Sequence, residues 1–168
     1  MEGRRYILGI DPGNEQSAYA LVDADTLRPV SFAKMENELM YCHMVDAIRA
    51  LELCSYQDLH VAIEMIASYG MPVGAEVFET CVWIGHLEER LKDFPVARIF
   101  RRDEKLTICG SPRANDANII QALTDRFAPG QPNHGKGTKK APGFFYGFRK
   151  DIWQAFAVAV TYHDMKEG

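Results

Sequence analysis

The sequence lacks several features that would each point to a particular class of protein. It has no apolar run long enough to cross a membrane, and the apolar segment near its N-terminus is too short for a signal peptide. Its four cysteines form no CxxC pair, which argues against a zinc knuckle and a disulfide framework. Internal repeats are also missing. We therefore expect a cytoplasmic protein, in a reduced compartment and with no membrane partner.

The length and the distribution of charge indicate the number of domains and the kind of partner. A chain of 168 residues suits a single domain, residues 1–168, that buries about 70% of its unfolded surface. Residues 1–97 carry 7 basic and 16 acidic side chains, whereas residues 98–151 carry 11 basic and 5 acidic ones. This asymmetry is typical of a polyanion-binding surface, although a set of solvated loops would have the same composition. Residues 128–143 are rich in Gly, Pro and Lys without any acid, which predicts a flexible basic loop.

Hydrophobic periodicity predicts an α/β fold. Apolar runs and alternation predict five strands, and apolar stripes at helical spacing predict four helices. The predicted strands are 6–10, 17–22, 28–32, 60–66 and 95–100, and the predicted helices are 36–54, 75–92, 116–127 and 151–165. This order predicts a mixed five-stranded sheet with helices on both faces. The second helix would bury Phe78, Cys81, Ile84, Leu87 and Leu91.

Asp11 ends the first predicted strand, in the motif ILGIDPG. A carboxylate at the end of a buried strand is costly unless it is paired or holds a cation. Alternatively, Asp11 only starts the turn at Pro12-Gly13 by accepting hydrogen bonds from backbone amides. Glu64 likewise ends an apolar strand. If the two strands are parallel neighbours, the two acids lie about 4.8 Å apart.

Carboxylates at that separation repel each other, and a divalent ion removes the repulsion. Ligands that are all oxygen favour Mg²⁺ or Mn²⁺. Two such ions about 4 Å apart can activate a water molecule and stabilise the leaving oxygen of a phosphodiester.

Four motifs in this order resemble the RuvC-type Holliday-junction resolvases, within the ribonuclease H-like nucleases. They are ILGIDPG, VAIE, EKLTICGSPRANDANIIQAL and DIWQAFAVAVTYH, which together cover most of the chain outside the 128–143 loop. The resemblance implies a ribonuclease H-like fold, dependence on Mg²⁺ with Mn²⁺ as a possible substitute, and a homodimer. It also implies that the substrate is branched DNA such as a Holliday junction.

Residue by residue, the resemblance implies that Asp11, Glu64 and Asp151 bind metal and that Lys105 lies near the scissile phosphate. The chain departs from the family pattern at two positions. The second acid of the last helix is replaced by Gln154, an uncharged candidate ligand, and a second lysine is replaced by Asp116. In both respects the chain is more similar to phage-type members than to bacterial ones.

Cations and aromatic residues are candidates for contact with DNA. Tyr69 and Met71 follow the second acid, where they could stack on bases or wedge between them. The segment FFYGF could act in the same way or could belong to the core. Cations that would neutralise phosphates are Arg101, Arg102, Arg113, Lys136, Lys139, Lys140, Arg149 and Lys150.

The sequence therefore predicts an endonuclease that cleaves branched DNA. Two alternatives come from other functional classes. Gln154 in place of an acid would suit a junction-binding protein that does not cleave. An actin-like phosphotransferase also begins with a strand and an acidic glycine turn, but its fold needs two ribonuclease H-like halves. The broad apolar stripe of the predicted helix 75–92 makes it the candidate dimer face.

Overall fold

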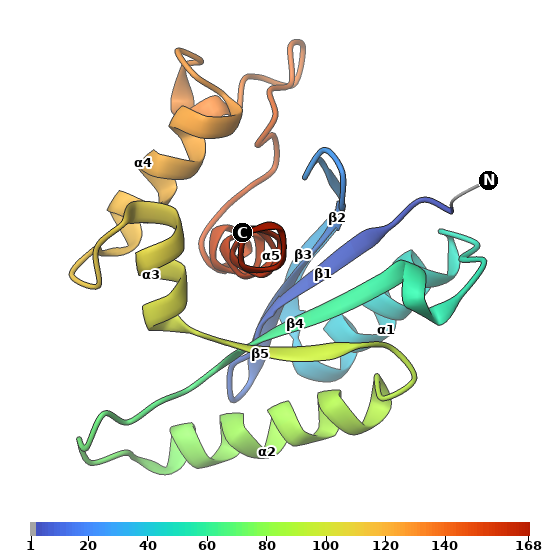
Figure 1. The fold of residues 1–168 in the computed structure, drawn as a ribbon, viewed down its shortest axis with the longest axis vertical. Coiled ribbons are helices and arrows are strands. Elements are labelled where there is room, and N and C mark those ends of the chain that lie inside the picture. Colours follow the sequence, from blue (N-terminus) through green and yellow to red (C-terminus); the bar gives the residue numbers. More distant parts are fainter. Residues whose placement is uncertain (1–2) are drawn as a thin grey trace.

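The computed structural model describes residues 3–168, which form one five-stranded mixed sheet covered by helices on both faces (Figure 1). The strand order is β3-β2-β1-β4-β5, with β1 antiparallel to β2 and parallel to β4. The strands are β1 (Tyr6–Asp11), β2 (Gln16–Asp23), β3 (Pro29–Glu36), β4 (Leu59–Met65) and β5 (Val96–Phe100). The predicted sheet is thereby confirmed. None of the helices in this range is both long and apolar enough to cross a membrane.

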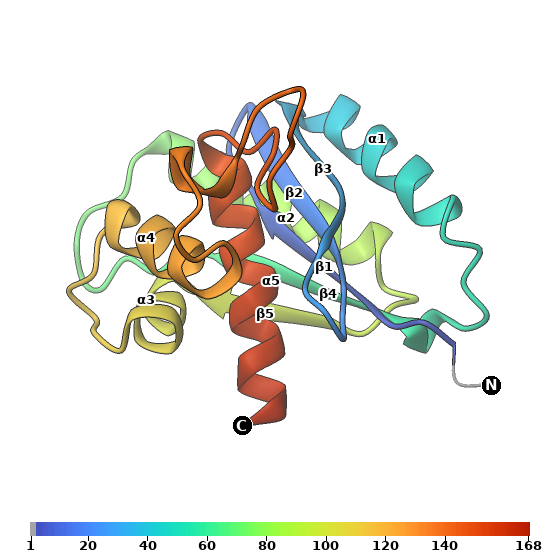
Figure 2. The same cartoon turned by 90° about the horizontal axis from the view of Figure 1, so that it is seen from above.

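The helices divide between the two faces of the sheet (Figures 1 and 2). One face is covered by α1 (Asn37–Arg49) and α2 (Ala75–Arg90). On the other face α5 (Asp151–Glu167) packs directly on the strands, flanked by α3 (Arg101–Cys109) and α4 (Asp116–Phe127). Short 3₁₀ turns, η1 and η2, span Tyr56–Asp58 and Asn133–Gly135.

The central strand β1 is apolar on both faces because each face covers a separate core. Leu8 and Ile10 point into the core beneath α1 and α2, whereas Ile7 packs with the buried residues of α5. Side chains alternate between faces along a strand, so every second residue of β1 lies on the α5 side. A strand buried on both faces needs this continuous apolar run, which is why the sequence alone identifies it.

Gly9 lets α5 approach β1 closely. A Cβ atom at this position would lie 2.1 Å from the carbonyl oxygen of Ala155 and 2.8 Å from the backbone nitrogen of Ala159. Only glycine allows the helix backbone to lie directly on the strand here. The contact holds α5 against β1 at Ala155 and Ala159, in the turns that follow Asp151.

Two predicted boundaries are wrong, and one helix was missed. The third strand extends to Glu36 because Lys34, Met35 and Glu36 continue the ladder with β2. The first helix ends at Arg49, five residues early, since Glu52 adopts a left-handed conformation with φ 50° that interrupts the helix. Helix α3 was not predicted at all, because Arg101 to Lys105 have the composition of a solvated strand exit.

Local signals nevertheless explain α3. The carboxylate of Asp103 accepts the backbone N–H of Phe100 at 3.2 Å, and Gly110 ends the helix with φ 69°. A left-handed glycine after the last turn is a common helix terminator. Helix α3 therefore follows β5 directly and turns the basic segment back toward α5.

Two side-chain predictions are settled by burial. Ile84, Leu87 and Leu91 are buried as predicted, whereas Phe78, also expected in the core, is 62% exposed because α2 buries Thr80 and Trp83 in its place. In the FFYGF segment, Phe145 and Phe148 are fully buried and pack against Trp153 and Phe156 of α5, whereas Tyr146 is exposed. This segment is mainly core and anchors the preceding loop to α5.

Candidate functional site

Asp11 and Glu64 lie side by side where β1 and β4 end. The two strands are parallel and pair Ile10 with Ile63, so the next residue of each is an acid. Gly9 and Ala62 face α5, and the alternation of side chains places both acids on that same face. The carboxyl group of each acid acts on the pKa of the other. The predicted juxtaposition of these two acids is present in the structure.

Both acids are held in an environment that disfavours charge. Burial, followed by the neighbouring carboxyl group of Glu64, raises the pKa of Asp11 to about 9. Burial also raises the pKa of Glu64, against the attraction of Arg101. Two carboxylates this close ionise together only if a cation joins them. The pair therefore carries a proton or binds a positively charged partner.

The turn that follows Asp11 is held by other side chains. The backbone N–H of Gly13 donates to Ser17 Oγ at 3.1 Å, and Asn37 Nδ2 donates to the carbonyl oxygens of Gly13 and Asn14. Within residues 3–168, no backbone amide donates to the Asp11 carboxylate. The alternative role of Asp11 as a turn-forming residue is therefore wrong, since its carboxylate does not hold the turn.

Asp151 begins α5 and pairs with a lysine that the sequence did not single out. Lys34 of β3 forms an ion pair with Asp151, with their side chains 23% and 44% exposed. Lys34 is opposite Ala18 in the β2–β3 ladder, on the α5 side of the sheet. Asp151 also contributes to the raised pKa of Asp11, which places it near the two strand acids. The three predicted metal-binding acids thus lie around one end of the sheet.

Gln154 is one helical turn beyond Asp151 and is engaged by Arg101. The Nη1 atom of Arg101 donates to the side-chain oxygen of Gln154, and its Nη2 atom donates to Asp116. Arg101 also pairs with Glu104, with 2.6 Å between Nη1 and Oε2. Arg101, predicted to bind DNA, is thus held by three side chains of the chain itself.

Glu104 is a buried acid of this site that sequence reasoning missed. It is fully buried, and its Oε1 atom has no hydrogen-bond partner among the described residues. Burial and then the charge of Glu64 raise its pKa to about 8, against the pairing with Arg101. The only sequence signal is the spacing of three between Arg101 and Glu104, which has meaning only once α3 is known.

Lys105, predicted near the scissile phosphate, lies on α3, and the predicted DNA-binding residues are distributed over several elements. Lys105 is four residues after Arg101 on α3, so the two share one helix face. Tyr69 and Met71 are 66% and 71% exposed in the loop between β4 and α2, which projects beyond the start of α2 (Figure 1). The remaining cations are exposed, except half-buried Lys136; they are Arg102, Arg113, Lys136, Lys139, Lys140, Arg149 and Lys150.

A basic groove of about 590 Å³ leads away from this end of the sheet. It lies between β3 and the chain that precedes α5, and its cationic lining residues are Lys34, Lys136 and Arg149. Lys34 lines this groove and also pairs with Asp151, so one of the groove's cations contacts an acid of the site. The cations of the groove can bind a polyanion.

The donor set fits a hard divalent cation. Asp11, Glu64, Asp151 and Gln154 offer only oxygen atoms, and the close acids need positive charge. Among residues 3–168, however, no three His, Cys, Asp or Glu side chains are arranged to hold a metal ion as they stand. Asp151 and Glu104 are each paired with a cation of the chain. An ion would thus compete with Lys34 for Asp151.

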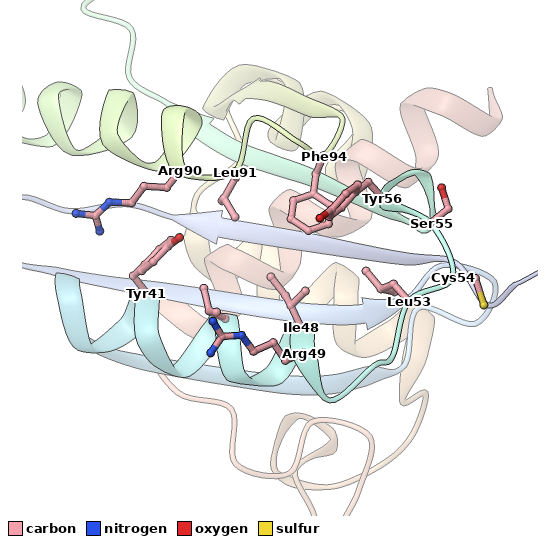
Figure 3. A pocket seen from close by; sticks show the side chains of 11 residues that line it. Tyr41, Ile48, Arg49, Leu53, Cys54, Ser55, Tyr56, Arg90, Leu91 and Phe94 are labelled. Atoms are coloured by element: carbon pink, nitrogen blue, oxygen red, sulfur yellow. The ribbon is translucent and has the colours of Figure 1, made fainter.

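A pocket of about 470 Å³ lies elsewhere, between the ends of α1 and α2 (Figure 3). Its walls include Ile48, Tyr56, Leu91 and Phe94, which point into the space between the two helices. It is near the start of β4, whereas the acids lie where β1 and β4 end. It shares no residue with the acidic centre.

Comparison with known proteins identifies the fold. No protein-family model matches the sequence, and a search of curated proteins gives no significant match. Among solved structures, Thermus thermophilus RuvC has 14% identity and a TM-score of 0.64, over 96% of this chain and 95% of that chain. T. thermophilus RuvC in complex with a Holliday junction substrate has 14% identity and a TM-score of 0.60, covering 96% of both chains.

The large terminase nuclease of the thermophilic phage G20c matches with 13% identity and a TM-score of 0.43, over 94% of this chain and 82% of that chain. Each of the two RuvC structures covers 96% of this chain. At this level of identity they establish the architecture. The chain has the ribonuclease H-like fold of RuvC.

Proposed function

We propose that the chain is a metal-dependent endonuclease that cleaves phosphodiesters in branched DNA, with the Holliday junction as a substrate. The observation that carries this proposal is the pairing of Asp11 with Glu64 on adjacent parallel strands beneath α5. Two acids in such an environment favour a divalent cation. The fold is also that of RuvC, for which a structure in complex with a Holliday junction substrate exists.

Asp11, Glu64 and Asp151 would hold the ion, Mg²⁺ or Mn²⁺. Bound there, it would lower the pKa of a water molecule and neutralise charge on the scissile phosphate. Lys105 shares a face of α3 with Arg101, and its ammonium group would bind a phosphate oxygen. The raised pKa of Asp11 also lets this carboxyl group retain a proton in the absence of an ion.

The DNA backbone would enter along the basic groove. Lys34, Lys136 and Arg149 line it, and Lys139, Lys140 and Lys150 are exposed nearby in the sequence. Contacts of this kind supply affinity without reading the base sequence. Tyr69 and Met71, exposed in the loop after Glu64, would contact bases at the branch point.

The active form would be a homodimer, so that two sites cut two strands. Phe78 and Val82 are both 62% exposed and four residues apart on α2, which gives this helix an apolar outer face. Light scattering of Phe78→Ser tests this assignment. Conversion to a monomer is expected, whereas Met165→Ser, at an exposed position on α5, should stay dimeric; a dimeric Phe78→Ser protein would exclude α2.

A junction-binding protein without nuclease activity is the second candidate. It is favoured by the pairing of Asp151 with Lys34 and of Gln154 with Arg101, since these contacts neutralise the site without a metal. One cleavage assay distinguishes the two functions. An end-labelled four-way junction and a linear duplex are incubated with the protein in Mg²⁺ or in chelator. The proposal expects cleavage of the junction in Mg²⁺ only; tight binding with no cleavage in either Mg²⁺ or Mn²⁺ would establish the second candidate.

A further inference from the structure

Arg101 gathers oxygen atoms from three helices around one guanidinium group. Through Nη1 it contacts Glu104 of its own helix α3 and Gln154 of α5, and through Nη2 it contacts Asp116 at the start of α4. Its side chain is 24% exposed; the contact with Glu104 is buried, whereas Asp116 is 70% exposed. The residue is therefore a fixed internal cation at the edge of the acidic centre.

Gln154 faces this guanidinium with its only acceptor atom. Residues 151 and 154 are three apart on α5 and share a face, so Gln154 lies beside the acid at position 151. A second ion bound at Gln154 would need the oxygen that now accepts from Arg101. The neutral amide suits a guanidinium, because it completes the hydrogen bonding of Arg101 without adding negative charge.

Buried Glu104 is the second reason for a permanent cation at Arg101. Its carboxyl group is fully buried, and Arg101 is its ion-pair partner, at 2.6 Å. The second carboxyl oxygen, Oε1, has no partner in residues 3–168. A buried carboxyl group that is ionised needs a cation, and for Glu104 that cation is the guanidinium of Arg101. The charge of Glu64 raises the pKa of Glu104, and the charge of Glu104 in turn raises that of Asp11, so Glu104 is joined electrostatically to the Asp11–Glu64 pair.

Resting on the proposed function, we propose that the guanidinium of Arg101 permanently occupies the position of a second cation, so that each chain binds a single divalent ion beside Asp11 and Glu64. Arginine stays charged at every accessible pH and presents five donors in a planar fork. Those donors meet two carboxylates and one amide oxygen here. The result is a site with one exchangeable ion and one built-in cation.

The number of Mn²⁺ ions bound per chain tests this inference without any measurement of cleavage. Mn²⁺ alone is titrated into the full chain, with free ion followed by electron paramagnetic resonance and heat by calorimetry. The wild type should bind one Mn²⁺. Arg101→Gln should bind two, because Glu104, Gln154 and Asp116 lose their shared cation.

Arg126→Gln is the matched control. Arg126 of α4 pairs with Asp164 of α5, with 2.6 Å between Nη1 and Oδ2, which equals the distance between Arg101 Nη1 and Glu104 Oε2. This pair lies outside the acidic centre. This variant should bind one Mn²⁺, as the wild type does. A second ion in Arg126→Gln would mean that any lost arginine charge creates a site, which would overturn the inference.

The other outcomes separate this inference from the proposed function. Two ions in the wild type would overturn the role of Arg101 and leave a metal-dependent nuclease in place. No bound ion in the wild type would overturn the proposed function itself. A single ion in a folded Arg101→Gln protein would show that the guanidinium does not stand for a second cation.

Arg101→Gln leaves Glu104 unpaired and could unfold the chain, so its folding is followed by circular dichroism. If the variant is unfolded in chelator, it is refolded in Mn²⁺. An ion that replaces the guanidinium should restore the helical signal, whereas failure of Mn²⁺ to restore it would contradict the proposal.

Discussion

Lys34 of β3 forms an ion pair with Asp151 at the first turn of α5. The pair joins the edge region of the sheet to the helix that carries the third acid of the candidate site. It also places a cation where a metal ion would need Asp151. Lys34 is therefore expected to compete with the ion for this carboxylate.

Lys34→Met tests this competition, because it removes the charge and keeps an unbranched side chain. The metal-free variant should lose about 0.5–1 kcal/mol of unfolding free energy, the usual size of a partly exposed ion pair. Its affinity for Mn²⁺ should rise in the absence of DNA. Lys92→Met, which breaks the surface pair with Glu89, should leave Mn²⁺ affinity unchanged. Weaker Mn²⁺ binding by Lys34→Met would show that Lys34 supports the site rather than blocks it.

The raised pKa of Asp11 predicts how the metal-free protein responds to pH. Between the ordinary value of 3.8 and about 9, the unfolded chain has released this proton while the folded chain keeps it. Unfolding then releases a proton, so stability falls as pH rises through this window, by at most about 1.4 kcal/mol per pH unit for each proton. Asp11→Asn should flatten the dependence.

Urea unfolding at a series of pH values, in chelator, measures this slope for the wild type, Asp11→Asn and Asp125→Asn. Asp125 is an exposed acid on α4, and its replacement should leave the slope as it is in the wild type. Equal slopes in Asp11→Asn and the wild type would contradict the assigned protonation.

Gly9→Ala should be strongly destabilising. Its methyl group would lie 2.1 Å from the carbonyl oxygen of Ala155, so α5 would have to move away from β1 at a cost of about 1–3 kcal/mol. Gly85→Ala is the control, because a methyl group on this residue of α2 meets nothing within 4 Å. That change should stabilise the helix by roughly 0.5–1 kcal/mol. Chemical denaturation compares the two; a Gly9→Ala protein as stable as the wild type would refute the close approach.

The basic loop of residues 128–143 should contribute affinity for DNA without taking part in cleavage. Replacing Lys136, Lys139 and Lys140 together by Ala should lower the slope of log affinity against log salt by roughly two to three. A variant with Arg49, Lys92 and Lys166 replaced by Ala removes the same charge elsewhere and should keep the slope. Filter binding of a four-way junction at several salt concentrations gives both values. An unchanged slope in the first variant would place DNA on another surface.

The sequence predicted the part of the site that lies on the central strands. Asp11 and Glu64 each end an apolar run, and two parallel strands with one register bring such positions together. Asp151 could be placed because the apolar helix that starts there was also clear. In each case, local pattern and strand geometry were sufficient.

The cations and the fourth acid of the site could not be predicted in the same way. Lys34 faces α5 only because β3 extends beyond Phe32, and that extension depends on pairing with β2. Glu104 is buried because α3 packs on α5, which the charged sequence around it does not suggest. Burial of charge depends on partners distant in sequence, and Arg101 has two such partners, Asp116 and Gln154.

The most direct test of the central claim is a comparison of cleavage and binding in Asp11→Asn and Glu64→Gln. Both variants remove a carboxylate that would bind the ion, and neither removes a cation of the basic groove. With an end-labelled four-way junction in Mg²⁺, each should lose several kcal/mol of transition-state stabilisation, on the order of a thousandfold in rate. Gel-shift affinity in chelator should remain that of the wild type. Near-wild-type cleavage by either variant would contradict the assignment of a metal-dependent nuclease to this pair of acids.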